Sequence, residues 1–174
     1  MKQINLILII LVFDSAYTYS ELLDEIRKDV IDAALLSLPN REKRDLLKMR
    51  FEMTNTKFVF SLTDIETAYF IYRWITENID YDCSHNSEEI NELGGSVYTK
   101  GKGSSSGISD LFTILTKYLY IESGIISGII KVLVDDKNEM IKIKDFHWNY
   151  ILINDTYYLL DVSSGAGTCI GEDL

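Results

Sequence analysis

Three short segments carry the residue types that nucleophilic catalysis needs. Residues 101–112 read G-K-G-S-S-S-G-I-S-D-L-F, residues 146–149 read F-H-W-N, and residues 157–167 read Y-Y-L-L-D-V-S-S-G-A-G. A hydroxyl or thiol nucleophile needs a general base to take its proton and a carboxylate to orient that base. Ser105, His147 and Asp161 supply one candidate for each role. The sequence therefore allows a serine-type triad, provided that the fold brings the three residues together.

The three segments together resemble the core of the transglutaminase-like superfamily, in particular the branch that contains the kyphoscoliosis peptidase. In that family the three segments usually read G-K-G-V-C-x-G-Y-A-D-L-F, H-A-W-N and W-Y-L-[IL]-D-x-T-W-G-A-G. Residues 71–82 also follow its pattern I-x-x-W-I-x-x-N-I-x-Y-D. The resemblance covers about residues 65–167. It implies a papain-like fold, in which the nucleophile opens a helix that packs on a small antiparallel sheet.

The chain departs from the family pattern at the positions that carry the chemistry. Ser105 stands where the family has its nucleophilic Cys, and Phe146 stands where it has its catalytic His, two residues before Trp148. Ser164 replaces a family Trp, and only the acid is retained, as Asp161. A serine hydroxyl is far less acidic than a thiol, so a helix N-terminus cannot ionise it near neutral pH. The resemblance therefore implies a transglutaminase-like domain whose catalytic triad is degenerate.

His147 and Asp161 each have two interpretations. Because side chains alternate along a strand, residue 147 is expected to face away from the site, and residue 146 toward it, if Trp148 keeps the family's position. A β-bulge or a one-residue slip would swing His147 inward and complete the triad. An Asp that ends a strand before Ser-Ser-Gly often only caps the following turn. The other histidine, His85, lies in a polar segment and is a weaker candidate for a base.

Three classes of function follow from these residues. The first is a pseudoenzyme, an exported binding or structural module that keeps the family's cleft for a protein or peptide ligand. The second is an active peptidase or protein-glutamine acyltransferase-type enzyme that uses Ser105 with His147 and Asp161. The third treats Ser105 as a replacement of a natural Cys, so that the parent would be a cysteine peptidase or an amide cross-linking enzyme. A phosphate cradle at residues 104–106 is a further alternative, because helix N-termini bind anions, but its spacing is not that of a P-loop.

Composition and net charge disfavour some classes of binding partner. A net charge of -10 makes nucleic acid or an anionic membrane surface an improbable partner. An apolar fraction of 47% and a charged fraction of 25% are those of an ordinary globular protein. No His/Cys cluster has zinc spacing and no calcium-loop pattern occurs in the sequence. We therefore expect no metal and no other cofactor.

The elements that must position the candidate residues follow from the spacing of apolar positions. We expect helices near residues 20–36, 40–53, 61–78 and 106–122, and strands near residues 125–134, 140–144, 148–153 and 156–162. Ser61 with Asp64 is the expected capping box of the third helix, and Asn154-Asp155 is the expected hairpin turn. Residues 54–60 and 96–99 read as short extended stretches. Helices followed by antiparallel strands predict an α+β fold.

The N-terminal residues predict export. Lys2 precedes the apolar run Leu6–Phe13, whose length suits a signal peptide and is too short to span a bilayer. We expect a signal peptide over residues 1–20, a helical extension over 21–60 and the transglutaminase-like domain over 61–174, as a truncated or minimal version. A buried N-terminal strand or helix is the alternative for the apolar run.

Export would place the chain in an oxidising compartment of the secretory pathway or outside the cell. Cys83 and Cys169 could then pair, although two independent thiols fit the sequence equally well. The sequon at Asn154 is compatible with glycosylation on a surface turn.

Overall fold

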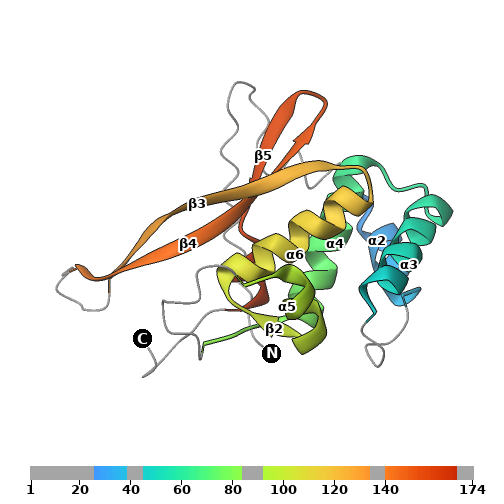
Figure 1. Ribbon diagram of the computed structural model, residues 1–174. Coiled ribbons are helices and arrows are strands. Elements are labelled where there is room, and N and C mark those ends of the chain that lie inside the picture. The colour runs from blue at the N-terminus through green and yellow to red at the C-terminus, as the bar shows by residue number, and fades with distance from the viewer. Residues whose placement is uncertain (1–25, 39–44, 84–91, 134–139, 168–174) are drawn as a thin grey trace.

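The computed structural model describes residues 26–38, 45–83, 92–133 and 140–167 (Figure 1). The helices of this part are α2 (Lys28–Leu36), α3 (Leu46–Val59), α4 (Asp64–Asn78), α5 (Gly94–Lys100), α6 (Ser105–Tyr118) and α7 (Val162–Ala166). The strands are β1 (Asp80–Tyr81), β2 (Lys102–Gly103), β3 (Glu122–Leu133), β4 (Met140–Ile153) and β5 (Thr156–Leu160). The α+β expectation is confirmed, with the helices first and the main sheet last. The expected signal peptide, residues 1–20, lies outside the described residues.

The main sheet is antiparallel, with β4 in the centre and the order β3-β4-β5. β4 runs unbroken where two separate strands were expected. The turn between β4 and β5 is the expected hairpin, because Asn154 and Asp155 have φ values of 50° and 60°, the left-handed pair that a two-residue hairpin needs. A second, two-stranded parallel sheet pairs β1 with β2. It brings the chain just before α6 alongside the end of α4.

The buried core lies where α6 packs against the main sheet on one side and against α4 on the other. Figure 1 shows α6 lying against the sheet, with α4 behind it and the long β3–β4 hairpin reaching away from the helices. The apolar face expected for this helix is fully buried, at Ile108, Leu111, Phe112 and Leu115. Ser123 on β3 and Thr116 on α6 join their hydroxyls at 2.6 Å across the same contact. One face of the main sheet is therefore covered by α6.

Two local expectations were wrong, and tertiary contacts explain both. Residues 54–59 continue α3, because Met53 and Thr56 are buried on its inner face. Residues 94–100 form α5, where Val97 and Tyr98 are buried and the Asp110 carboxylate of α6 accepts a hydrogen bond from Gly94 N at 2.7 Å. Packing outweighed the weak extended propensity of both stretches.

The capping box of α4 is also shifted from the expected position. Thr63, not Ser61, is the N-cap: its hydroxyl accepts from Glu66 N, and Glu66 accepts from Thr63 N at 2.9 Å. The Glu66 side chain is 1% exposed and also accepts from Arg27 Nε and Nη2, each at 2.6 Å. The Arg27 bonds, helped by those from backbone N–H groups, lower the pKa of Glu66 from 4.5 to about 2 despite its burial.

This depressed pKa predicts a loss of stability in acid. The folded chain holds Glu66 as a carboxylate and the unfolded chain protonates it more readily, so its contribution is present above pH 4.5 and is lost as the pH falls toward 2. We expect Glu66→Gln to lower the free energy of unfolding by about 2 kcal/mol at neutral pH. The gap between the two proteins should narrow below pH 4.5 in urea titrations. Glu77→Gln is the control, because Glu77 pairs with Arg73 on the surface and should change stability by less than about 0.5 kcal/mol. Equal effects of the two substitutions would contradict the assignment.

Candidate active site

Ser105 is the first residue of α6, one residue before the expected start of that helix, and is 5% exposed. Ser104 is the N-cap, and its hydroxyl accepts from Gly107 N at 3.2 Å. The turn ahead of it is tightly held, since Gly101 ends α5 with a φ of 75° and β2 pairs with β1. The helix N-terminus therefore places a hydroxyl where the positive end of the helix dipole lies.

A buried carboxylate that sequence reasoning missed lies at this end of α6. Glu92, whose side chain is 5% exposed, accepts from Ser104 N at 2.8 Å and from Ser104 Oγ at 3.0 Å, and its other oxygen lies 3.3 Å from Lys100 Nζ. A Cβ on Gly107 would come within 2.7 Å of the Glu92 carboxylate, so a larger residue would force that carboxylate to shift. Glu92 already supplies the negative charge that the dipole favours here, which disfavours a second anion such as phosphate. No local pattern marks Glu92 among the acidic residues around it.

His147 faces α6, which reverses the expected orientation. Asn149, two residues along β4, donates to Ser109 O at 2.9 Å and to Thr113 Oγ1 at 3.1 Å, so its face of the strand is the α6 face. The register of β4 with β3 shifts only between Val132 and Leu133, so His147 shares that face without a bulge. Ser109, one turn after Ser105, also donates its hydroxyl to His147 O at 3.1 Å.

Phe146 and Trp148 lie on the opposite face of the sheet. Their rings are 5.2 Å apart, and a Cβ on Gly128, the register partner of Phe146, would meet the Trp148 ring at 2.7 Å. Phe146 is nevertheless buried, with 7% exposure. Phe146 therefore lies on the face of β4 away from α6, whereas its neighbour His147 lies on the same face as Asn149.

Asp161 lies where β5 passes into α7, and its carboxylate caps that helix. One oxygen accepts from Ser164 N at 3.0 Å and from Ser163 Oγ at 3.2 Å. The capping role considered for this residue is therefore present in the structure. Leu160, just before it, pairs with Asn149 of β4, which places Asp161 near the strand that carries His147.

The three candidates come from adjoining elements but are not joined. Among the described residues, no hydrogen bond links any two of the Ser105, His147 and Asp161 side chains, and His147 Nδ1 is buried with no partner. A proton relay requires such bonds, although they are often looser without substrate. The arrangement places a hydroxyl, an imidazole and a carboxylate on adjoining elements without a preformed relay.

Two other features bear on the candidate chemistry. Within the described ranges, no cluster of three or more His, Cys, Asp or Glu side chains could hold a metal ion. In the same part of the chain, none of the helices combines the length and the apolar character that a membrane span requires. Cys83 is disulfide-bonded; the chain's other cysteine, Cys169, lies outside the described residues.

Comparisons with known proteins match the chain to a family model described as the transglutaminase-like superfamily, over residues 53–162. One similar solved structure is described as "a Putative Cysteine Protease from Cytophaga hutchinsonii"; it is 18% identical, with a TM-score of 0.46, over 81% of this chain and 44% of that one. Another is described as "a Putative Protease from Parabacteroides distasonis"; it is 16% identical, with a TM-score of 0.42, over 75% of this chain and 26% of that one. The chain thus spans less than half the length of either. No curated protein matches the chain.

Proposed function

This chain belongs to the transglutaminase-like superfamily, and we propose that it is a catalytically inactive member, an exported binding or structural module. The missing hydrogen bond between His147 and Asp161 carries the proposal most directly. A triad acid must accept a hydrogen bond from the histidine to orient it, whereas the bonds that Asp161 accepts come from Ser163 and Ser164, both through Oδ1. His147 Nδ1 correspondingly has no partner.

The surroundings of Ser105 support the same conclusion. Ser105 has a hydroxyl in place of the family's thiol, and the helix dipole that would help to ionise a thiol already meets the Glu92 carboxylate. With 5% exposure, Ser105 also offers little of its surface to a substrate. The joint change at the nucleophile, at residue 146 and at residue 164 points to a site that has lost turnover rather than exchanged one nucleophile for another.

Export and the finer family placement belong to the proposal as well. A disulfide at Cys83 supports an oxidising compartment, because such bonds are rare in the cytosol, and residues 1–20 have the composition of a signal peptide. The motif segments favour the branch of the kyphoscoliosis peptidase. The proposed ligand is a protein or peptide in the cleft that the family uses, bound without being cleaved or cross-linked.

An activity comparison tests the inactive state. We expect the purified protein to hydrolyse fluorogenic peptides, and to incorporate an amine into a glutamine-containing protein, no faster than its Ser105→Ala variant. Ser105→Cys should gain no turnover and only slow thiol labelling at neutral pH, because neither imidazole nor carboxylate is positioned to deprotonate it. Rapid labelling of that variant would instead support a parent enzyme that used a cysteine.

The active serine hydrolase remains the second candidate, because His147 shares the α6 face of β4 with Asn149. It predicts turnover that is lost by at least about a hundredfold in both Ser105→Ala and His147→Ala. Such a result would replace the inactive module with a serine triad that assembles only on substrate binding.

A further inference from the structure

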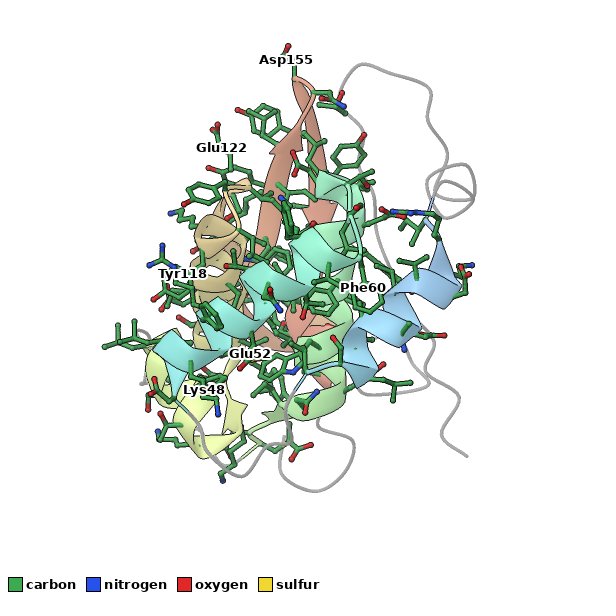
Figure 2. The ribbon with its side chains drawn as sticks, turned by 90° about the vertical axis from the view of Figure 1, so that its right-hand side faces the viewer. Lys48, Glu52, Phe60, Tyr118, Glu122 and Asp155 are labelled. Carbon is green, nitrogen blue, oxygen red and sulfur yellow. The ribbon has the colours of Figure 1, made fainter. Side chains whose placement is uncertain are left out.

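Helix α3 carries apolar side chains on its outer face as well as on its inner one. Leu47, Phe51 and Phe58 are 70%, 69% and 83% exposed, whereas Met49 and Met53 are buried against the core. A surface helix ordinarily turns only one apolar stripe toward the protein and presents polar residues to water. Figure 2 looks onto this side of the molecule, with α3 crossing the front and Lys48 and Glu52 labelled along it.

The outer residues follow the spacing of a helix-packing seam. Leu47, Phe51, Thr54 and Phe58 are separated by four, three and four residues and are all exposed. This is the a/d repeat by which one helix packs along another. The row is narrow and interrupted by a threonine, and Val59, which is 63% exposed, widens it only at the end of the helix. It suits a facing helix better than the broad apolar face of a helix that lies in a membrane surface.

The positions that flank this seam are basic or neutral. They are Lys48, Arg50, Asn55 and Lys57, in a chain whose net charge is -10. Lys57 already pairs with Asp64 at 2.9 Å, and Arg50 lies 4.8 Å from the centre of the Tyr118 ring. Flanking charges select the partner of a helix pair, because like charges across it repel.

A second copy of α3 does not complement these charges. If two copies are aligned antiparallel so that Leu47 meets Phe58, the same alignment sets Arg50 of one copy against Lys57 of the other. In a parallel pair, basic and neutral residues again face one another. Acidic residues at the flanking positions of the partner would instead meet Lys48 and Arg50.

We propose that the outer face of α3 is a docking site for a partner helix that has an apolar a/d seam and acidic flanking residues. The surface meets α6 at its C-terminal end, where Arg50 lies against Tyr118, whereas Ser105 lies at the opposite end of that helix, so the proposal does not depend on whether the candidate active site turns over substrate. An inactive module with this surface would have two binding regions, one at the family cleft and one on α3.

The probe is a labelled three-heptad peptide with leucine at its a and d positions and glutamate at its e and g positions, titrated into the full chain by fluorescence anisotropy. The matched control peptide has lysine at e and g. We expect the glutamate peptide to bind, the lysine peptide to bind at least about tenfold more weakly, and added salt to weaken the first. Phe51→Ser or Phe58→Ser should weaken binding at least about tenfold.

Tyr157→Ser is the control variant, because Tyr157 is a half-exposed aromatic on β5, away from α3. It should bind the glutamate peptide like the unchanged protein. Each variant replaces an exposed side chain, so circular dichroism and melting temperature should be unchanged and separate lost binding from lost folding.

Three results would overturn the proposal. The first is that the glutamate and lysine peptides bind equally well, or that neither of them binds. The second is that the glutamate peptide still binds the Phe51→Ser variant. The third is a different occupant: sedimentation showing a dimer that Phe51→Ser dissociates, or binding to phosphatidylserine vesicles that the same variant abolishes. None of these results bears on the activity comparison that tests the inactive site.

Discussion

Replacing Gly94 with alanine is expected to lower the free energy of unfolding by about 3 kcal/mol, a large effect for one methyl group. Gly94 begins α5 and lies against the backbone of α6. A Cβ there would lie 2.4 Å from Leu111 N and 2.6 Å from Leu111 Cα. Backbone atoms of a helix cannot rotate away as a side chain can, so the helices must separate. Separation would also stretch the 2.7 Å bond from Gly94 N to the Asp110 carboxylate.

Gly95→Ala is the matched control for this prediction. Its Cβ would meet nothing within 4 Å, and alanine favours a helix over glycine by up to about 1 kcal/mol. We therefore expect the two neighbouring substitutions to have opposite signs in chemical unfolding. Equal stability of the two variants would mean that α5 and α6 do not approach as the structure has them. The contact matters for the candidate site, because α5 leads through Gly101 into the turn before Ser105.

Replacing Asn149 with alanine is expected to cost about 3 kcal/mol as well. Its side chain is fully buried, and its amide nitrogen lies 2.9 Å from Ser109 O, 3.1 Å from Thr113 Oγ1 and 3.3 Å from Gly124 O. One amide thus ties the central strand to α6 and to β3. Alanine would leave a cavity at that junction and remove the donor from buried acceptors.

Asn78→Ala is the control for the asparagine prediction. The Asn78 amide donates to Trp74 O within its own helix, so its loss should cost less than about 1 kcal/mol. Unfolding of the two variants in urea measures the difference. A small effect at position 149 would show that the fit between α6 and the sheet does not rest on this amide.

Elements with a strong local pattern could be predicted from the sequence. The helix predicted over 61–78 and the one predicted over 106–122 appear as α4 and α6, and the Asn154-Asp155 turn joins β4 to β5. These elements are fixed by periodicity and turn chemistry within a few residues, so neighbouring residues suffice to find them. The superfamily was also visible in the sequence, because several of its scaffold motifs occur in order; the match over residues 53–162 confirms it.

Elements held by distant partners could not be predicted. The formation of α5 depends on Asp110, sixteen residues after the Gly94 amide that it binds. The place of Glu92 beside Ser104 depends on the fold around a glycine at position 107. A short stretch of sequence does not contain such information, because the two contacting residues come together only when the helices pack.

By itself, the sequence determined the α+β order, the helix predicted over 106–122 that appears as α6, and the resemblance to the transglutaminase-like superfamily. Only the tertiary structure decided which face of β4 lies against α6, and hence that His147 rather than Phe146 points toward that helix. Alternation along a strand fixes which residues share a face, but not which of the two faces is covered. Packing against α6, through Asn149 and Ile151 in the core, makes that choice.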